Sequence, residues 1–476
     1  MTKVLVFSLA AASLAWTQVP PVQTGQSLAG VVRLNRAPIS NEVLKVKLPR
    51  PVERKLPNGI RLVILESHRA PTISFRMALP AGSLRDPKGM PGVADATAAL
   101  IRLGTKTRAA RDIADSLADL GAQVSFIATQ NETAVLVSAL TENFDAALAI
   151  LGDVLLNPTF PQDELDRWKS RQIASLDAAK SQPPFLANDI LSKALYGADA
   201  RQYTHPSADA LNQMTRDMIL EHYKKYYVPS GNLAGIAGDI TPEDAVAKLN
   251  KVLGAWKGGP VAPVALPDLP PIAEKKAYLA VRPTSTQSLI VLANHAIERA
   301  SPDYIPCQVL NRILGGGPSS RLFRVLREEK GYTYGISSNF TAQRNQNQFT
   351  VGTQMRTDMT EPALTEILTQ FAAIRDRQVP AEELADAKSA IAASFVLGLE
   401  SSSAVLGRWL EQREYGFPED YWDTYVQKIM AVTAEDVQRV AKKYVPLENV
   451  QIVAVGDATI ADILKKFGPL EMVKVD

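Results

Sequence analysis

The sequence predicts an α+β protein built from two copies of one domain, each a mainly antiparallel sheet with helices on one face. Three observations support this fold class. Segments that alternate apolar and polar residues precede longer segments with apolar residues every three or four positions, the patterns of strands and helices. Residues 258–274 are rich in proline and separate two patterned halves. The second half then repeats the order of the first.

The internal repeat can be followed residue by residue. Thr215 begins TRDMILEHYKKYYVPSGNLAGIAGD, and Thr433 begins TAEDVQRVAKKYVPLENVQIVAVGD. Thr433 follows Thr215 by 218 positions and Gly456 follows Gly238 by the same 218, so the two segments align without a gap. Each has a threonine suited to cap a helix, a Lys-Lys-Tyr end and a strand that closes in Gly-Asp. The chain is therefore expected to be a duplication.

Strands of the first half are expected where β-branched and aromatic residues alternate with polar ones. They fall at residues 60–67, 71–80, 123–129, 133–140 and 232–238. Helices are expected where apolar residues recur at helical spacing. They fall within residues 91–103 and 111–120, at 144–155, from 161 onward, up to 196, and at 215–226.

Early in the second half, residues 314–336 read LGGGPSSRLFRVLREEKGYTYGI and combine a loop, a helix and the start of a strand. The helix is expected to span residues 318–331, and the YTYGISSNF that follows alternates as a strand does. Arg327 then lies in the last helical turn and Tyr334 just past the corner, both aimed toward the space beside the loop. Three glycines form that loop, where the preceding helix ends: Gly315, Gly316 and Gly317.

Arg327 and Tyr334 suit the polarisation of a peptide carbonyl. A guanidinium carries a fixed charge and a planar fork of donors, and a phenol is a neutral donor. Donors placed where negative charge develops stabilise acyl-transfer transition states by about 3–4 kcal/mol each. Two structural roles remain open: the arginine can complement the helix dipole, and the tyrosine can pack with its hydroxyl at the surface. The glycines are equally compatible with a plain turn between helices.

The composition excludes several kinds of function. The chain has 52 Lys+Arg against 50 Asp+Glu, without long runs of either sign, which does not favour nucleic acid as a partner. The single cysteine, Cys307, excludes an intrachain disulfide and a cysteine-based metal cluster. The histidines lack the spacing of metal ligands: His68, His205, His222 and His295.

The N-terminus reads Met-Thr-Lys and then VLVFSLAAASLAW, an apolar run with the length of a signal-peptide core and too short to span a bilayer. Residues 1–17 are predicted to be a signal peptide and residues 18–50 an arm on the surface. No later stretch is continuously apolar enough to cross a membrane. An exported protein is expected, periplasmic if the source is a bacterium.

Three long segments resemble the insulinase-like zinc peptidases, the family of pitrilysin and the mitochondrial processing peptidase. They are LPNGIRLVILESHRAPTISFRMALPAGSLRDPKGMPGVADATAALIRLGTKTRAARDIADSLADLGAQVSF, TENFDAALAILGDVLLNPTFPQDEL and LGGGPSSRLFRVLREEKGYTYGISS, in the family's order. The resemblance runs from about residue 52 to the C-terminus. It implies two homologous domains, 51–257 and 275–476, joined by the linker 258–274 and forming half of a clamshell round a chamber.

The zinc half of the family's site is missing from this sequence. The family uses a His-x-x-Glu-His helix and a distant glutamate to hold zinc and supply a base. The matching helix positions are here Asp95, Ala98 and Ala99. The distant acid falls near Ser175, where Asp177 is the nearest carboxylate. A lone carboxylate cannot hold zinc, which takes three or four protein ligands, so this chain is expected to bind no metal.

The other half of the family's site matches. Members use an Arg and a Tyr seven residues apart to hold the substrate backbone and the transition state, and Arg327 and Tyr334 match both types and spacing. Tyr332 and Tyr334 are expected on the same side of the predicted strand, so Tyr332 is a second candidate for the tyrosine's role. The resemblance also implies substrate contact by the glycine loop. In two-chain members, one chain carries the zinc motif and the other the Arg/Tyr pair.

The resemblance therefore implies the non-zinc subunit of an exported heterodimeric metallopeptidase that is inactive alone. The expected substrate is a peptide or an unfolded polypeptide segment. Zinc is expected on the partner, a homologous chain with an intact zinc motif. The alternative is a non-catalytic peptide-binding or scaffold subunit that keeps the family fold.

Overall fold

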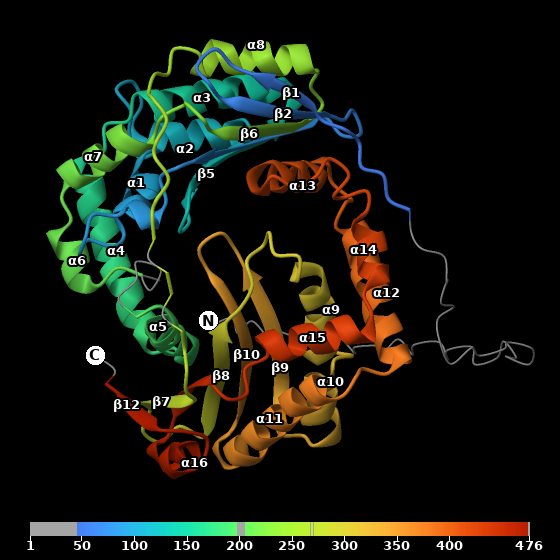
Figure 1. The fold of residues 1–476 in the computed structure, drawn as a ribbon. Coiled ribbons are helices and arrows are strands. Elements are labelled where there is room, and N and C mark those ends of the chain that lie inside the picture. Colours follow the sequence, from blue (N-terminus) through green and yellow to red (C-terminus); the bar gives the residue numbers. More distant parts are fainter. Residues whose placement is uncertain (1–44, 198–204, 267, 270, 475–476) are drawn as a thin grey trace, which may run out of the picture. The chain divides into compact units, whose positions relative to one another are not determined.

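The computed structural model describes residues 45–197, 205–266, 268–269 and 271–474. The predicted signal peptide and residues 18–44 of the predicted arm lie outside the described residues. Two six-stranded sheets packed with helices make up the described chain, which confirms the predicted α+β class (Figure 1).

The first sheet has the strand order β1-β2-β6-β3-β5-β4 and is mainly antiparallel, with β2 and β6 as a parallel pair. Its strands are β1 Val52–Lys55, β2 Arg61–Glu66, β3 Thr72–Leu79, β4 Gln123–Ala128, β5 Thr133–Leu140 and β6 Leu233–Gly238. The five strands predicted for the first half are all present, because each alternates buried and exposed side chains or is buried on both faces.

The second sheet has the order β12-β7-β11-β8-β10-β9, in which β7 pairs in parallel with both of its neighbours. Its strands are β7 Lys276–Val281, β8 Gln287–His295, β9 Thr333–Ala342, β10 Asn347–Arg356, β11 Gln451–Gly456 and β12 Leu470–Val473. The order of the five strands β7-β11-β8-β10-β9 matches β2-β6-β3-β5-β4 of the first sheet, and the predicted duplication is confirmed. The edges differ, because β1 precedes its domain's other strands in the chain whereas β12 follows them.

The helices of the first half are α1 Val93–Leu100, α2 Ala110–Asp119, α3 Phe144–Leu156, α4 Gln162–Lys180, α5 Pro183–Tyr196, α6 Ala208–Gln213, α7 Arg216–Tyr226 and α8 Pro242–Leu253. Those of the second half are α9 Tyr304–Leu314, α10 Arg321–Phe323, α11 Thr360–Asp376, α12 Ala381–Leu397, α13 Ser402–Tyr415, α14 Tyr425–Ala431, α15 Ala434–Tyr444 and α16 Ala461–Lys465. As expected, Thr215 and Thr433 cap α7 and α15 with their side chains. Within the described residues, no single helix has the length and apolar character of a membrane span, although α12 and α13, bent by 112°, meet that test jointly.

The helix predicted from residue 318 begins later than expected. Ser320 is extended and lies just before α10, so the helix starts at Arg321. It continues as a π-helical turn, Arg324–Glu329, in which Lys330 N–H donates to the Val325 carbonyl five residues earlier. Gly331, at φ 65°, ends it as predicted.

Each sheet also receives one helix from the other half, which corrects the expectation that helices cover one face only. Helix α13 packs against β6 and β2, and α5 packs against β11 and β8 (Figure 1). In β6, Ala234 and Ile236 join the core of the first half, whereas Ala237 joins the cluster that contains Leu406 of α13. A Cβ on Gly235 would lie 2.9 Å from the Leu406 side chain. Because successive strand residues point to opposite faces, α13 lies on the face away from the first core.

The predicted domain boundaries at 257 and 275 stay predictions. The described residues between α8 and β7 form no regular structure, in keeping with a linker. The exchanged helices nevertheless join the two halves, and the described residues make one compact unit.

Residues 48–50, near the start of the described residues, form a strap over α13. Leu48 is buried in the same cluster as Trp409 of α13. The Trp409 indole N–H donates to the Pro49 carbonyl at 2.9 Å, and the Arg50 guanidinium lies 5.0 Å from the indole ring. Arg50 also pairs with Asp423. The strap therefore fixes the segment before β1 to the second half.

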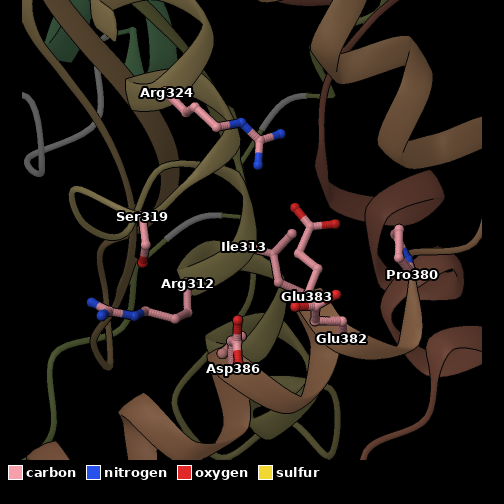
Figure 2. Close-up of a pocket in the computed structure, with 9 residues that line it drawn as sticks. Arg312, Ile313, Ser319, Arg324, Pro380, Glu382, Glu383 and Asp386 are labelled. Atoms are coloured by element: carbon pink, nitrogen blue, oxygen red, sulfur yellow. The ribbon is translucent and has the colours of Figure 1, made fainter. Parts of the chain in front are cut away.

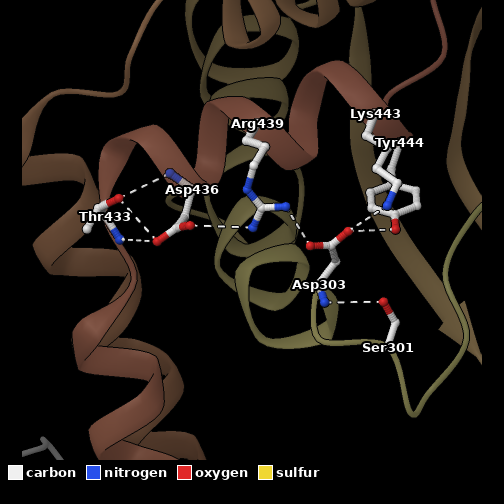
Figure 3. Close-up of polar contacts among 7 residues, drawn as sticks. All are labelled: Ser301, Asp303, Thr433, Asp436, Arg439, Lys443 and Tyr444. Atoms are coloured by element: carbon white, nitrogen blue, oxygen red, sulfur yellow. Dashed lines mark hydrogen bonds and ion pairs between the residues drawn. The ribbon is translucent and has the colours of Figure 1, made fainter.

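A carboxylate at the start of α9 fixes this helix to α15 (Figure 3). Asp303 accepts hydrogen bonds from Arg439 at 2.6 Å, Lys443 at 2.9 Å and the Tyr444 hydroxyl at 2.8 Å. Burial opposes ionisation, but these donors outweigh it and lower the pKa of Asp303 from 3.8 to about 2. The ionised Asp303 therefore stabilises the packing of α9 on α15.

We expect Asp303→Asn to lower the free energy of unfolding by about 2 kcal/mol near pH 7, the value of the pKa shift by linkage. Because the folded pKa lies below the unfolded one, the native contribution is complete above about pH 4 and is lost as the pH falls toward about 2. Urea unfolding of the parent and of the variant near pH 7 and near pH 2 measures the difference in unfolding free energy. Asp462→Asn is the control, since Asp462 is exposed in its pair with Lys465. Equal losses from both variants would contradict the assignment.

Candidate functional site

Arg327 lies on the π-helical turn with its guanidinium between two aromatic rings. The buried Leu322, Val325 and Leu326 attach this segment to the core, which leaves Arg327 on the exposed side. Its guanidinium carbon lies 4.8 Å from the Phe323 ring centroid and 4.7 Å from that of Tyr334. The turn thus brings Arg327 and Tyr334 into contact by a cation–π interaction.

Tyr334 stands at the start of β9 and exposes 85 % of its surface. The register of β9 on β10 shifts here: Gln354 lies opposite Gly335, and Met355 lies opposite Thr333. Tyr334 is the extra residue of a β-bulge, a feature that commonly re-aims a side chain beside a functional site. Arg327 contacts the ring of Tyr334 and not its hydroxyl. Because the side chain is exposed, the phenol hydroxyl is accessible to a ligand.

Tyr332 does not share the position of Tyr334. The sequence pattern suggested that both tyrosines lie on one side of a strand, but Tyr332 precedes β9 and is partly buried against the second core. Its backbone N–H donates to the Leu326 carbonyl at 2.8 Å, which closes the π-helical turn. Of the two tyrosines, Tyr334 alone contacts Arg327 within the described structure.

The glycine loop, Gly315 to Gly317, packs against β9. Its first two backbone N–H groups both donate to the Asn311 carbonyl, and Arg312 donates to the Gly316 carbonyl at 2.9 Å. Ser338 N–H of β9 donates to the Gly315 carbonyl at 3.0 Å. The loop is therefore attached to the strand that carries Tyr334, and its glycines have a structural role whether or not they touch substrate.

Gly315→Ala is expected to destabilise the fold by about 1–3 kcal/mol, because the added Cβ would lie 2.5 Å from Ser338 Oγ and 2.6 Å from its backbone nitrogen. Chemical unfolding measures this loss. Gly352→Ala in β10 is the matched control, since an added Cβ there meets nothing within 4 Å. A Gly315 variant as stable as the control would show that the close approach to β9 is not needed.

A polar cavity of about 380 Å³ lies beside the loop (Figure 2). Arg312, Ser319 and Arg324 line one side, and the carboxylates of Glu382, Glu383 and Asp386 on α12 line the other. Arg321 donates two hydrogen bonds to Glu383, at 2.8 and 2.6 Å, and holds α10 against α12. The cavity and this ion pair were not foreseen, because the partners are 62 residues apart and lie on separate elements.

The helix that corresponds to the zinc helix is α1, and its side chains do not fit a metal. Asp95 lines a hollow of about 250 Å³ together with Asp86 and His205, whereas Ala98 is buried. Burial raises the pKa of Asp95. Burial also raises the pKa of Asp86 to about 7, although Asp86 accepts hydrogen bonds from the Gly92 and Ala94 N–H groups at the start of α1.

Two family models match the chain. "Insulinase (Peptidase family M16)" matches residues 61–206, and "Peptidase M16 inactive domain" matches residues 213–391. Together they cover more than half of the sequence, in the order of the two structural halves. The chain belongs to peptidase family M16.

Relatives and solved structures agree with the family. The M16 chain is 24% identical over 388 residues to an uncharacterized zinc protease, YmxG, of Bacillus subtilis, covering 81% of this chain and 93% of that one. It is 23% identical over 401 residues to an uncharacterized zinc protease of Streptomyces coelicolor, covering 81% and 85%. A crystal structure of a peptidase M16 inactive domain from Pseudomonas fluorescens superposes with a TM-score of 0.79 at 27% identity, covering 86% and 98%. A protease from Helicobacter pylori shares the fold, with a TM-score of 0.78 at 18% identity and coverage of 86% and 100%.

The relatives are named zinc proteases, and the donor set of the M16 chain does not fit zinc. Positions 95, 98 and 99 supply one carboxylate and two methyl groups, short of the three or four ligands that zinc takes. No group of three or more potential metal ligands occurs among the described residues.

The histidines of the M16 chain make separate local contacts. His68 is hydrogen-bonded to Glu66 and Asp239, the His205 ring lies tilted against Phe185, and His295 packs near Tyr196. His222 is buried, which lowers its pKa to about 4. These contacts hold the four side chains in separate places.

Proposed function

We propose that this M16 chain is the non-zinc subunit of an exported heterodimeric metallopeptidase that cleaves peptides or unfolded polypeptide segments. The observation that carries the proposal is the contact between the Arg327 guanidinium and the exposed Tyr334 ring. The predicted signal peptide supports export, and in a bacterium the protein would act in the periplasm. A homologous partner with an intact zinc motif would supply the metal centre.

The division of roles follows from the chemistry of the two side chains. The Arg327 guanidinium, with its fixed fork of donors, would bind main-chain carbonyl oxygens of the substrate and orient it. The Tyr334 hydroxyl would donate to the oxygen of the scissile carbonyl as negative charge develops on it. The bulge and the π-helical turn support this assignment, because both irregularities occur where these two residues must project.

Co-purification from the native host tests the proposal. We expect a homologous chain with the zinc motif to accompany this subunit, and peptide cleavage to require both chains. Each chain is then assayed separately and together, with zinc measured in each. Stoichiometric zinc and full activity in this subunit alone would refute the proposal. A stable pair that binds peptides without cleaving them would favour the scaffold alternative.

A further inference from the structure

The bulge at Tyr334 is stabilised by two threonine hydroxyls. A bulge leaves backbone N–H and C=O groups unpaired in the ladder, and such groups are costly when they are shielded from water. Here Gly335, which follows the bulged residue and lies opposite Gln354, also forms backbone hydrogen bonds with the side chains of Thr333 and Thr353. Both threonines are buried, with 7 % and 4 % of their surface exposed.

The two hydroxyls are hydrogen-bonded to each other and to the backbones of Gln354 and Gly335. The Thr333 hydroxyl donates to the Gln354 carbonyl at 2.6 Å and accepts from the Gly335 N–H at 3.1 Å. The Thr353 hydroxyl lies 2.9 Å from Thr333 Oγ1 and donates to the Gly335 carbonyl at 3.0 Å. The two hydroxyls thus satisfy both backbone groups of the residue that follows Tyr334.

We infer that Thr333 and Thr353 are positioning residues that hold Tyr334 in its projecting orientation against Arg327, an inference whose catalytic part rests on the proposed function. Tyr334 has little packing of its own, since 85 % of its surface is exposed. Its orientation must therefore come from the backbone on either side. On one side Tyr332 N–H is fixed to Leu326, and on the other the two hydroxyls fix Gly335.

Without the hydroxyls, the backbone beside the bulge loses these side-chain hydrogen bonds, which weakens the irregular register and favours a strand without the bulge. A strand without the extra residue alternates regularly, so the loss of the bulge moves Tyr334 away from its present direction. A misplacement of about 1 Å can cost up to about 100-fold in rate. The threonine pair therefore controls where the phenol hydroxyl lies while remaining out of reach of a substrate.

The test compares Thr353→Val, which keeps the shape and removes the hydroxyl, with Thr353→Ser, which keeps the hydroxyl. The chain is labelled with 3-fluorotyrosine, and the resonance of Tyr334 is identified by its loss in Tyr334→Phe. We expect Thr353→Val to shift or broaden that resonance and Thr353→Ser to retain it. In the reconstituted pair, kcat should fall about tenfold in Thr353→Val and recover in Thr353→Ser, with KM little changed.

Thr133→Val is the matched control. Thr133 is a fully buried strand threonine of the first sheet whose hydroxyl donates to the Ala81 carbonyl at 2.8 Å. The Thr133→Val variant should be less stable than the parent and should leave the Tyr334 resonance unchanged. An unchanged resonance in both Thr353→Val and Thr333→Val would overturn the positioning role. The resonance tests this role even if Tyr334→Phe has no effect on rate, an outcome that would count against the proposed function alone.

Discussion

Tyr334→Phe is expected to lower the rate of the reconstituted pair by about 10²–10³-fold, the usual cost of one donor to a developing oxyanion. The substitution removes a hydroxyl from a side chain that exposes 85 % of its surface, so folding and thermal stability should not change. The aromatic ring stays, and with it the contact to Arg327. Single-turnover cleavage of a peptide measures the effect on the chemical step.

Tyr332→Phe is the matched control for this experiment, because it removes the same hydroxyl two positions earlier in the chain. Tyr332 is partly buried against the second core and does not lie in the bulge, so its variant should keep the parental rate. Equal rates for Tyr334→Phe and the parent would remove Tyr334 from the mechanism. Equal losses in both variants would point to a general disturbance of this corner.

Arg299→Met is expected to lower the free energy of unfolding by about 3–5 kcal/mol, the cost of leaving one partner of a buried ion pair alone. Arg299 exposes 5 % of its side chain and donates to Glu411 on α13 at 2.7 Å and to the Tyr421 hydroxyl at 3.0 Å. Its guanidinium also lies 4.0 Å from the ring centroid of Tyr304 and 4.7 Å from that of Phe417. Urea unfolding followed by tryptophan fluorescence measures the loss.

The double variant Arg299→Met with Glu411→Gln should recover part of the lost stability, because it removes a carboxylate that the single variant leaves with only the 3.4 Å contact to Arg408. Arg356→Met serves as the surface control: Arg356 and Asp358 expose 69% and 62% of their side chains, so this pair contributes less than about 1 kcal/mol. A loss as small for Arg299→Met as for Arg356→Met would mean that the buried cation has little influence on the packing of α13.

Much of the fold followed from the sequence, because local patterns and the repeat gave the same answer. The aligned segments that begin at Thr215 and Thr433 became a capped helix and a central strand in both halves. Two helices in the first half, α6 and α8, were missed. Helix α6 has six residues, too few for a periodic pattern to stand out.

The exchange of α5 and α13 could not be read from the sequence. An apolar stripe shows that a helix will be buried, but not which of two homologous sheets will bury it. The usable signal was on the receiving strand, where Gly235 and Ala237 lack the bulk that would keep a helix away. The need for small residues at these positions arises only because Leu406, which is far away in the sequence, packs against them.

The candidate site was predicted in its residue types and not in its geometry. The spacing of Arg327 and Tyr334 suggested a shared space, and the two side chains do meet. The devices that bring them together, a π-helical turn and a one-residue bulge, break the regular periods on which sequence patterns depend. For the same reason the expectation for Tyr332 was wrong.

The exchange of helices has a consequence for synthesis, which proceeds from the N-terminus. When the first sheet has left the ribosome, the face of β6 that holds Gly235 has no cover, because α13 begins only at Ser402. Leu48, near the start of the described chain, likewise cannot pack in its cluster until Trp409 has been synthesised. The strap and the face of β6 that holds Gly235 therefore complete their packing last, and a nascent chain stalled before residue 402 should be a preferred client of chaperones.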